Sequence, residues 1–212
     1  MELTQQDFKS ATSAVASKAM RNELNALIEG IEDPNAKRAF EAEMSSFYHL
    51  FNRFLAEKAK GVKLDWDKIQ PPAAEQVTPY ASLPQASDPS VLSKLAVLKL
   101  NGGLGTTMGC TGPKSIIEVR EGMTFLDMSV RQIEHLNGTY NVNVPFILMN
   151  SFNTDDDTAR VIQKYANHNV EIMTFNQSRY PRINRDTLLP CPRSATSNKN
   201  LWYPPGHGDL FD

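Results

Sequence analysis

The stretch LNGGLGTTMGCTGPKS, residues 100–115, decides the fold, and it directly follows the apolar run LAVLKL of residues 95–100. Five of the chain's eleven glycines lie between Gly102 and Gly112. Because glycine has no side chain, backbone N–H groups in such a loop can approach and cradle phosphate oxygens. Lys114 adds a positive charge. We interpret the stretch as a phosphate-binding loop, with a ligand-free glycine-rich turn as the alternative.

The residues after this loop alternate between predicted helices and strands. Three apolar runs predict buried strands, at residues 95–100, 144–149 and 170–175. One helix is predicted over residues 125–136, with Thr124 as its N-cap. Another begins after Asn153 or Thr154, and its first turn carries three aspartates that suit the positive end of the helix dipole. This order predicts an α/β fold with a mostly parallel, Rossmann-like sheet flanked by helices. Such sheets bind ligands at the carboxyl ends of their strands, where the glycine-rich loop lies.

The glycine-rich loop matches neither of two common phosphate-binding motifs. A Walker loop requires lysine directly after glycine, whereas Pro113 separates Gly112 from Lys114. The dinucleotide fingerprint requires a third glycine where Met108 stands, and a helix directly after the loop. The next apolar residues, 116–119, follow too soon for a helix to fit. A dinucleotide-dependent oxidoreductase is therefore disfavoured.

Residues 1–66 are predicted to form an N-terminal helical segment, and its last helix is predicted to end at Gly61. Its second helix carries an apolar stripe, which consists of Phe40, Met44, Phe47, Tyr48, Phe51 and Leu55. The stripe could bind a partner, but burial within its own domain is the favoured interpretation. Residues 67–93 contain five prolines and predict an extended connection, which Val77, Tyr80 and Leu83 could pack against the following domain. Residues 94–212 are predicted to form the α/β domain.

Composition limits the possible classes of partner and compartment. The chain has 212 residues, with 22 Lys+Arg against 24 Asp+Glu, so its formal net charge is −2. This balance does not favour nucleic acid or a membrane surface as the main partner. The first residues lack a signal-peptide pattern, and no apolar run is long enough to span a membrane. The two cysteines, Cys110 and Cys191, exclude a disulfide-stapled scaffold. We expect a cytoplasmic protein.

Several ordered blocks of the sequence resemble one family, the eukaryotic-type UTP–glucose-1-phosphate uridylyltransferases, also called UDP-glucose pyrophosphorylases. The resemblance begins with the glycine-rich loop and runs to about residue 209. Its further blocks are FLD (125–127), QIEHL (132–136), MNSFNTD (149–155), FNQSRYPRI (175–183) and WYPPGHGD (202–209). It implies a sheet of the nucleotidyltransferase type. It also implies the formation of UDP-glucose and pyrophosphate from UTP and glucose 1-phosphate, in a reversible reaction.

The resemblance assigns nucleotide-binding roles to residues of the glycine-rich loop. Leu100, Asn101, Gly102 and Gly103 would line the uracil and phosphate end of UTP, and the two glycines would also contact the substrate. Lys114 would contact the triphosphate and act in catalysis.

Three residues further along the chain complete the implied site. Gln177 would hydrogen-bond the uracil edge, which suits an amide because it offers both a donor and an acceptor. Gly206 would lie against the nucleotide, and His207 would touch the sugar phosphate. Without the resemblance, Gln177 is more simply a satisfied amide at a strand end, and His207 a surface or packing residue. A basic run, which consists of Arg179, Arg182 and Arg185, could steer anionic substrates or form a solvated loop face.

The implied reaction joins two anions, so it requires positioning and charge neutralisation by Mg²⁺ and lysine rather than a general base. The family's metal-binding aspartate and second catalytic lysine would lie beyond residue 212, and Asp209 and Asp212 are not assigned as ligands. Full-length family members homo-oligomerise. We therefore expect this chain to be the N-terminal part of the enzyme, with an incomplete α/β domain and reduced activity. The alternative is a non-catalytic nucleotide-binding or interaction module.

Overall fold

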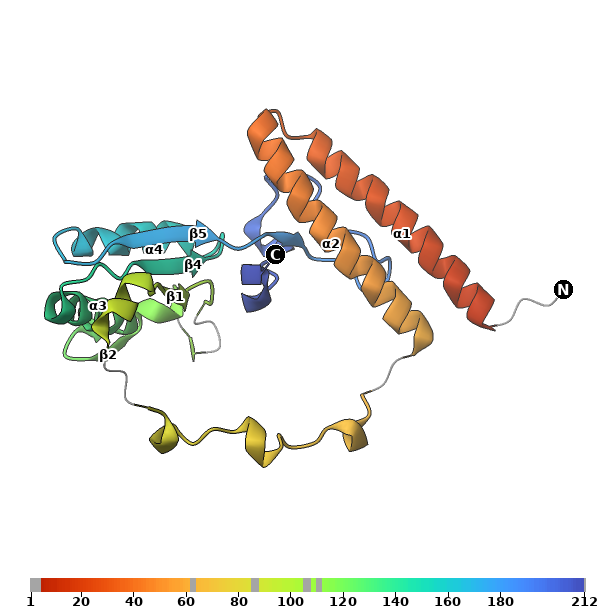
Figure 1. Cartoon of the computed structure of the whole chain (residues 1–212). Helices are drawn as coiled ribbons and strands as arrows, with labels where there is room; N and C mark the ends of the chain where they lie inside the picture. Colours follow the sequence, from red (N-terminus) through yellow and green to blue (C-terminus); the bar gives the residue numbers. More distant parts are fainter. Residues whose placement is uncertain (1–4, 62–63, 85–87, 105–107, 110–111, 212) are drawn as a thin grey trace.

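The computed structural model describes residues 5–61, 64–84, 88–104, 108–109 and 112–211, with side chains from residue 12 onward. Cys110 and Asp212 lie outside these ranges. The chain begins with two long helices, α1 (Gln5–Glu29) and α2 (Pro34–Lys60), which pack against each other as a hairpin (Figure 1). Asp33 caps α2, because its carboxylate accepts a hydrogen bond from Ala36 N at 2.7 Å. Gly61 ends α2 in the left-handed conformation at φ 64°, as predicted.

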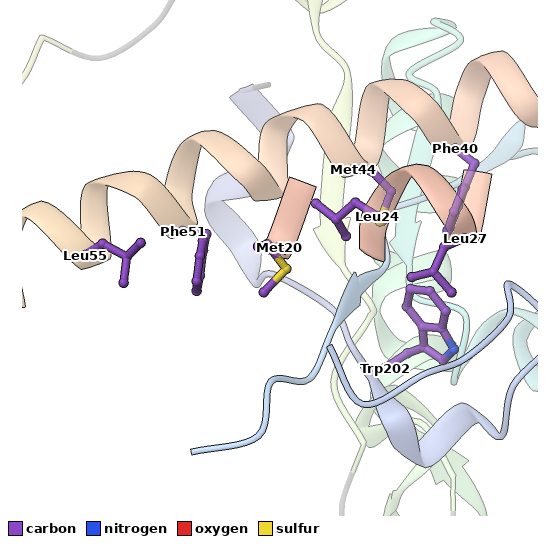
Figure 2. Close-up of a cluster of buried hydrophobic side chains, with 8 residues drawn as sticks. All are labelled: Met20, Leu24, Leu27, Phe40, Met44, Phe51, Leu55 and Trp202. Carbon is purple, nitrogen blue, oxygen red and sulfur yellow. The ribbon is translucent and has the colours of Figure 1, made fainter. Parts of the chain in front are cut away.

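The apolar stripe of α2 is buried within the chain. Its buried residues pack with Met20, Leu24 and Leu27 of α1 and with Trp202, far along the sequence. Figure 2 shows the Trp202 indole close to Leu27 and Phe40, and the rings of Phe40 and Trp202 meet edge to face at 5.8 Å. This packing confirms the interpretation that the apolar stripe of α2 is buried against other residues of the same chain. It also ties the helical hairpin to the segment that follows the sheet.

The connection between the hairpin and the sheet forms only short 3₁₀ turns in its described part. These turns are Trp66–Lys68, Ala74–Gln76, Tyr80–Ser82 and Pro89–Lys94. In Figure 1 the connection runs as a wide arc away from both parts. Val77, Tyr80 and Leu83 are 55%, 90% and 51% exposed, so the expectation that they pack against the α/β part is wrong. Proline prevents both helix and ladder formation in this segment.

The α/β part is built on a three-stranded parallel sheet with the strand order β1–β4–β5. Its strands are β1 (Val97–Leu100), β4 (Phe146–Asn150) and β5 (Ile172–Asn176), and Leu100 and Phe175 both pair with Met149. The connecting helices are α3 (Phe125–Tyr140) and α4 (Asp155–Ile162). The predicted parallel sheet is thus confirmed. Strand β4 begins two residues later than expected, after Pro145, which has no N–H to donate.

The two helix caps predicted in this part have different outcomes. Thr124 forms a reciprocal capping box with Asp127 at the start of α3, as expected. Thr154 stands at the N-cap position of α4, but its side chain makes no capping hydrogen bond. Its Oγ1 instead accepts a hydrogen bond from Ser151 N at 3.0 Å. Of the two residues expected at this helix start, Thr154 thus holds the N-cap position, but without the side-chain hydrogen bond of a cap.

Short elements complete the described structure. They are β2 (Glu118–Arg120), β3 (Met123–Thr124), β6 (Tyr180–Pro181), β7 (Trp202–Tyr203) and the 3₁₀ turns Lys114–Ile116, Gln163–Tyr165, Lys199–Leu201 and His207–Phe211. β2 pairs with β3 and β6 pairs with β7, both antiparallel. Within the described residues, the helices are all too short or too polar to cross a membrane.

Candidate nucleotide-binding site

A buried polar network holds the two ends of the glycine-rich loop together. Asn101 follows β1 and is 3% exposed. Its Nδ2 donates to Asn150 Oδ1 at 2.7 Å and to Thr158 Oγ1 at 2.9 Å, while Ser115 Oγ donates to Asn101 Oδ1. Lys114 N also donates to Gly103 O at 3.0 Å. The loop is therefore closed across its base, and its first and last residues are fixed at the carboxyl end of the sheet.

Gly102 lies under the side chain of Gln177, at the carboxyl end of the neighbouring strands. A Cβ atom at Gly102 would lie 2.0 Å from Gln177 Nε2 and 3.4 Å from Asn150 O. Gln177 is 6% exposed, and its Nε2 donates to Asn150 O at 3.3 Å. Ser151 Oγ donates to Gly102 O at 2.8 Å. The Gln177 amide occupies the space that a side chain at residue 102 would take, so any larger residue there would force the amide to move.

The segment around Gly206 and His207 is fastened to the residues that follow β5. Gly206 N donates to Gln177 Oε1 at 3.2 Å, and Gly206 adopts φ 111°, which strongly favours glycine. Ser178 N donates to Asp209 Oδ2 at 2.6 Å. Both amide atoms of Gln177 therefore have partners within the chain. The amide keeps a second N–H and a second lone pair for another contact.

A cavity of about 380 Å³, which we call the loop cavity, opens beside the glycine-rich loop. Five of the eight residues predicted for the site line it, namely Leu100, Asn101, Gly103, Lys114 and His207. Met108, Ile117 and Phe125 add apolar surface to its wall, and Lys99 a further amine. Among the described residues, no carboxylate forms an ion pair with Lys114. The lysine is exposed and available to an anion that enters the cavity.

A second cavity of about 420 Å³ lies against the same loop. Gly102 and Gly103 form one side of it, and Arg182, Lys199 and Tyr203 belong to its other walls. Gly103 therefore borders both cavities. No motif surrounds Lys199, so sequence reasoning could not single it out.

The three arginines of the basic run occupy different environments. Arg179 is half-buried over the Trp202 ring, with its guanidinium 4.5 Å from the ring centroid. Burial lowers the Arg179 pKa, an effect that the charge of Glu43 opposes, and burial raises the pKa of Glu43. Arg182 lies in the wall of the second cavity, and Arg185 is exposed. Arg182 and Arg185 are thus both exposed, which fits a solvated face for most of the run, and Arg179 is half-buried.

A charged cluster joins the first turn of α3 to the 3₁₀ turn Gln163–Tyr165 that follows α4. Asp127 accepts hydrogen bonds from Tyr165 Oη at 2.9 Å and pairs with Lys164 Nζ at 2.6 Å. Burial works against ionisation of Asp127, but its bonds with Lys164, Thr124 and Tyr165 outweigh it and hold its pKa well below the usual range. Burial and the Asp127 contact raise the Tyr165 pKa. The cluster is structural, because Tyr165 is packed in the core of the sheet.

The predicted site residues are therefore brought together, but their supports were not predicted. Asn150, Ser151 and Thr158 are buried and hold the loop. Asn150 and Ser151 directly follow the apolar run of residues 144–149, so polar residues at a strand's carboxyl end were the available signal. Thr158 gives no such signal. Within the described residues, no group of three or more His, Cys, Asp or Glu side chains could hold a metal ion.

A glycine-rich loop and an exposed lysine at the carboxyl edge of a parallel sheet define an α/β protein whose candidate site suits phosphate groups. The sequence model of the UTP--glucose-1-phosphate uridylyltransferase family matches residues 44–212. The chain belongs to this family.

Curated relatives and solved structures agree with this assignment. A probable UTP--glucose-1-phosphate uridylyltransferase from Schizosaccharomyces pombe is 58% identical over 97% of this chain and 41% of its own length. The Saccharomyces cerevisiae UTP--glucose-1-phosphate uridylyltransferase is 56% identical over 97% of this chain and 42% of its own length. The chain thus spans about two fifths of the length of these relatives.

Two solved structures share the fold over most of the chain. A UDP-glucose phosphorylase from Trypanosoma brucei is 33% identical, with a TM-score of 0.60, over 93% of this chain and 38% of that one. A mutant UDP-glucose pyrophosphorylase from Leishmania major in complex with UDP-glucose is 30% identical, with a TM-score of 0.66, over 92% and 38%. The fold of this chain is therefore shared with two solved structures, over about 38% of each of them.

Proposed function

We propose that the chain binds UTP in the loop cavity and contributes to the transfer of its uridylyl group to glucose 1-phosphate. The observation that carries this proposal is the loop cavity itself, where Gly103, Lys114 and His207 meet at the carboxyl end of β1. Membership of the uridylyltransferase family supports UTP and glucose 1-phosphate as the substrates. The relative from Leishmania major, whose structure holds UDP-glucose, supports the product.

In the proposed reaction an oxygen of the glucose 1-phosphate phosphate attacks the α-phosphorus of UTP. A new P–O bond forms, the bond from the α-phosphorus to the bridging oxygen breaks, and pyrophosphate leaves with that electron pair. The attacking oxygen is already ionised, so no group needs to remove a proton. The chain's task is to position two anions and to stabilise the charge that develops between them.

The residues that line the loop cavity, together with Gly102 and Gln177 beside it, each have a definite part in this proposal. Backbone N–H groups of Gly102 and Gly103 would contact the nucleotide, and Lys114 would pair with its phosphates. His207 would reach the phosphate of glucose 1-phosphate. Gln177 would use its remaining N–H and lone pair for the uracil edge, while its bonds to Asn150 and Gly206 hold it in place.

Mg²⁺ belongs to the proposal as a counter-ion of the triphosphate. Ions of this kind are held largely by substrate phosphates and water, with one or two carboxylates. The described residues do not build a three-ligand site of their own, so we assign no step to the ion.

The test is the formation of UDP-glucose from UTP and glucose 1-phosphate by the 212-residue chain with Mg²⁺. Lys114→Gln should lower kcat/KM by about 10²-fold, because it removes a charge that acts on the reacting phosphates. Lys94→Gln is the matched control, since Lys94 is exposed and outside both cavities. Selective UTP binding without turnover would contradict the activity and support the non-catalytic nucleotide-binding module.

A further inference from the structure

Lys114 does not line the second cavity, but Arg182 and Lys199 place positive charge there. Gly103 separates this cavity from the loop cavity, since it borders both. A triphosphate carries its largest negative charge on the terminal group, about −1.5 to −2. A nucleotide chain that passes along the glycine backbone would meet the side chains of the second cavity next.

Two cations of this cavity are not neutralised by buried acids. Among the described residues, Arg182 has no carboxylate within ion-pair distance. Lys199 Nζ lies 3.4 Å from Asp156 Oδ2, but the Asp156 side chain is 83% exposed. Exposed pairs of this kind are weak and are easily exchanged for another anion.

The local structure keeps both cations in the cavity wall. Arg182 N donates to Leu201 O at 2.9 Å, and the guanidinium lies over the Tyr203 ring, 4.8 Å from its centroid. Lys199 Nζ donates to Phe152 O at 3.2 Å. A guanidinium positioned over a ring still has its fork of N–H groups, which matches phosphate oxygens in pairs.

We propose that Arg182 and Lys199 form a subsite for the terminal phosphates of the nucleotide, the pair that leaves as pyrophosphate. This inference rests on the proposed function. When the α-phosphorus–oxygen bond breaks, the electron pair adds negative charge to the bridging oxygen of the leaving group. The two cations stabilise that charge, and in the reverse direction they bind the attacking pyrophosphate.

The experiment is calorimetric titration of the 212-residue chain with UTP, UDP-glucose and inorganic pyrophosphate, each with Mg²⁺. UDP-glucose carries the uracil and the α-phosphate, and its second phosphate comes from glucose 1-phosphate. Because it lacks the β- and γ-phosphates that leave as pyrophosphate, it serves as the internal reference. The variant is Arg182→Gln with Lys199→Gln, and Arg185→Gln is the control, because Arg185 is exposed and outside the cavity. Lys199→Gln alone replaces one exposed side chain, so it tests the subsite even if the double variant does not fold.

The double variant should bind UTP and pyrophosphate at least tenfold more weakly than the wild type. Its affinity for UDP-glucose should stay within about twofold of the wild type. Lys199→Gln alone should weaken the binding of UTP and pyrophosphate to a smaller degree. The control should match the wild type for all three ligands. Unchanged UTP and pyrophosphate affinity, or an equal loss for UDP-glucose, overturns the subsite while the proposed function stands. If the wild type binds neither UTP nor UDP-glucose, the proposed function and this inference are both overturned.

Discussion

Substituting the two adjacent glycines of the loop tests the packing of the site. A Cβ at Gly102 would lie 2.0 Å from Gln177 Nε2, whereas at Gly103 the nearest atom is Lys114 Cδ at 3.9 Å. In Gly102→Ala the amide must move, and it then loses its hydrogen bonds with Asn150 O and Gly206 N. Each is worth about 0.5–1.5 kcal/mol, so the loss is about 1–3 kcal/mol. Gly103→Ala should be neutral or stabilise by up to about 1 kcal/mol, because it restricts the unfolded chain.

Urea unfolding measures both variants, and thermal melting follows at about 2–4 °C per kcal/mol for a chain of this size. A double-mutant cycle with Gln177→Ala isolates the cause, because without the amide the methyl group of Gly102→Ala has room. The cost of Gly102→Ala should then largely disappear. Equal stability of Gly102→Ala and Gly103→Ala, or an undiminished cost in the Gln177→Ala background, would refute the reasoning.

Three further predictions concern the supports of the site. Thr124→Ala should lower the free energy of unfolding by about 1 kcal/mol through loss of the α3 cap, while Thr139→Ala at the exposed far end of α3 should not change it. Asn101→Ala should cost about 2–4 kcal/mol in urea unfolding, because it leaves buried partners unsatisfied, and Asn143→Ala at an exposed asparagine serves as its comparison. The folded-state pKa of Asp127 lies below its ordinary 3.8, so its ionised contacts stabilise the fold above that pH. The stability difference between wild type and Asp127→Asn should be full above about pH 5 and shrink as the pH falls below 3.8, and a difference that grows on acidification would contradict the assignment.

Local patterns predicted the elements well, whereas partners distant in the sequence had to come from the structure. The stripe of α2 follows from helical periodicity, but nothing in the sequence marks Trp202 as its partner. Thr124 and Thr154 both precede acidic residues, and only Thr124 caps with its side chain. The hydroxyl of Thr154 instead accepts a hydrogen bond from Ser151 N, three residues earlier, and helix-cap preferences alone do not contain this local turn.

The same limit applies to the candidate site. Strand ends and the glycine pattern place Lys114 and Gln177 at one edge, and the structure brings them there. The bond between Gln177 and Gly206 was not predictable, because it depends on how residues 178–205 return to the sheet. Arg182 was weighed in the sequence only as a member of a basic run. The structure separates it from Arg179 and sets it beside Lys199.

The most direct test of the central claim is a thermal melt of the 212-residue chain with Mg²⁺, with and without UTP or ATP. At 100 times its Kd, UTP should stabilise the fold by about 2.7 kcal/mol, which corresponds to a rise of about 5–10 °C. ATP at the same concentration should give a much smaller shift, because Gln177 is proposed to read a uracil edge. A cooperative melt that UTP leaves unchanged, or that ATP raises equally, would contradict a uridine nucleotide site at the glycine-rich loop.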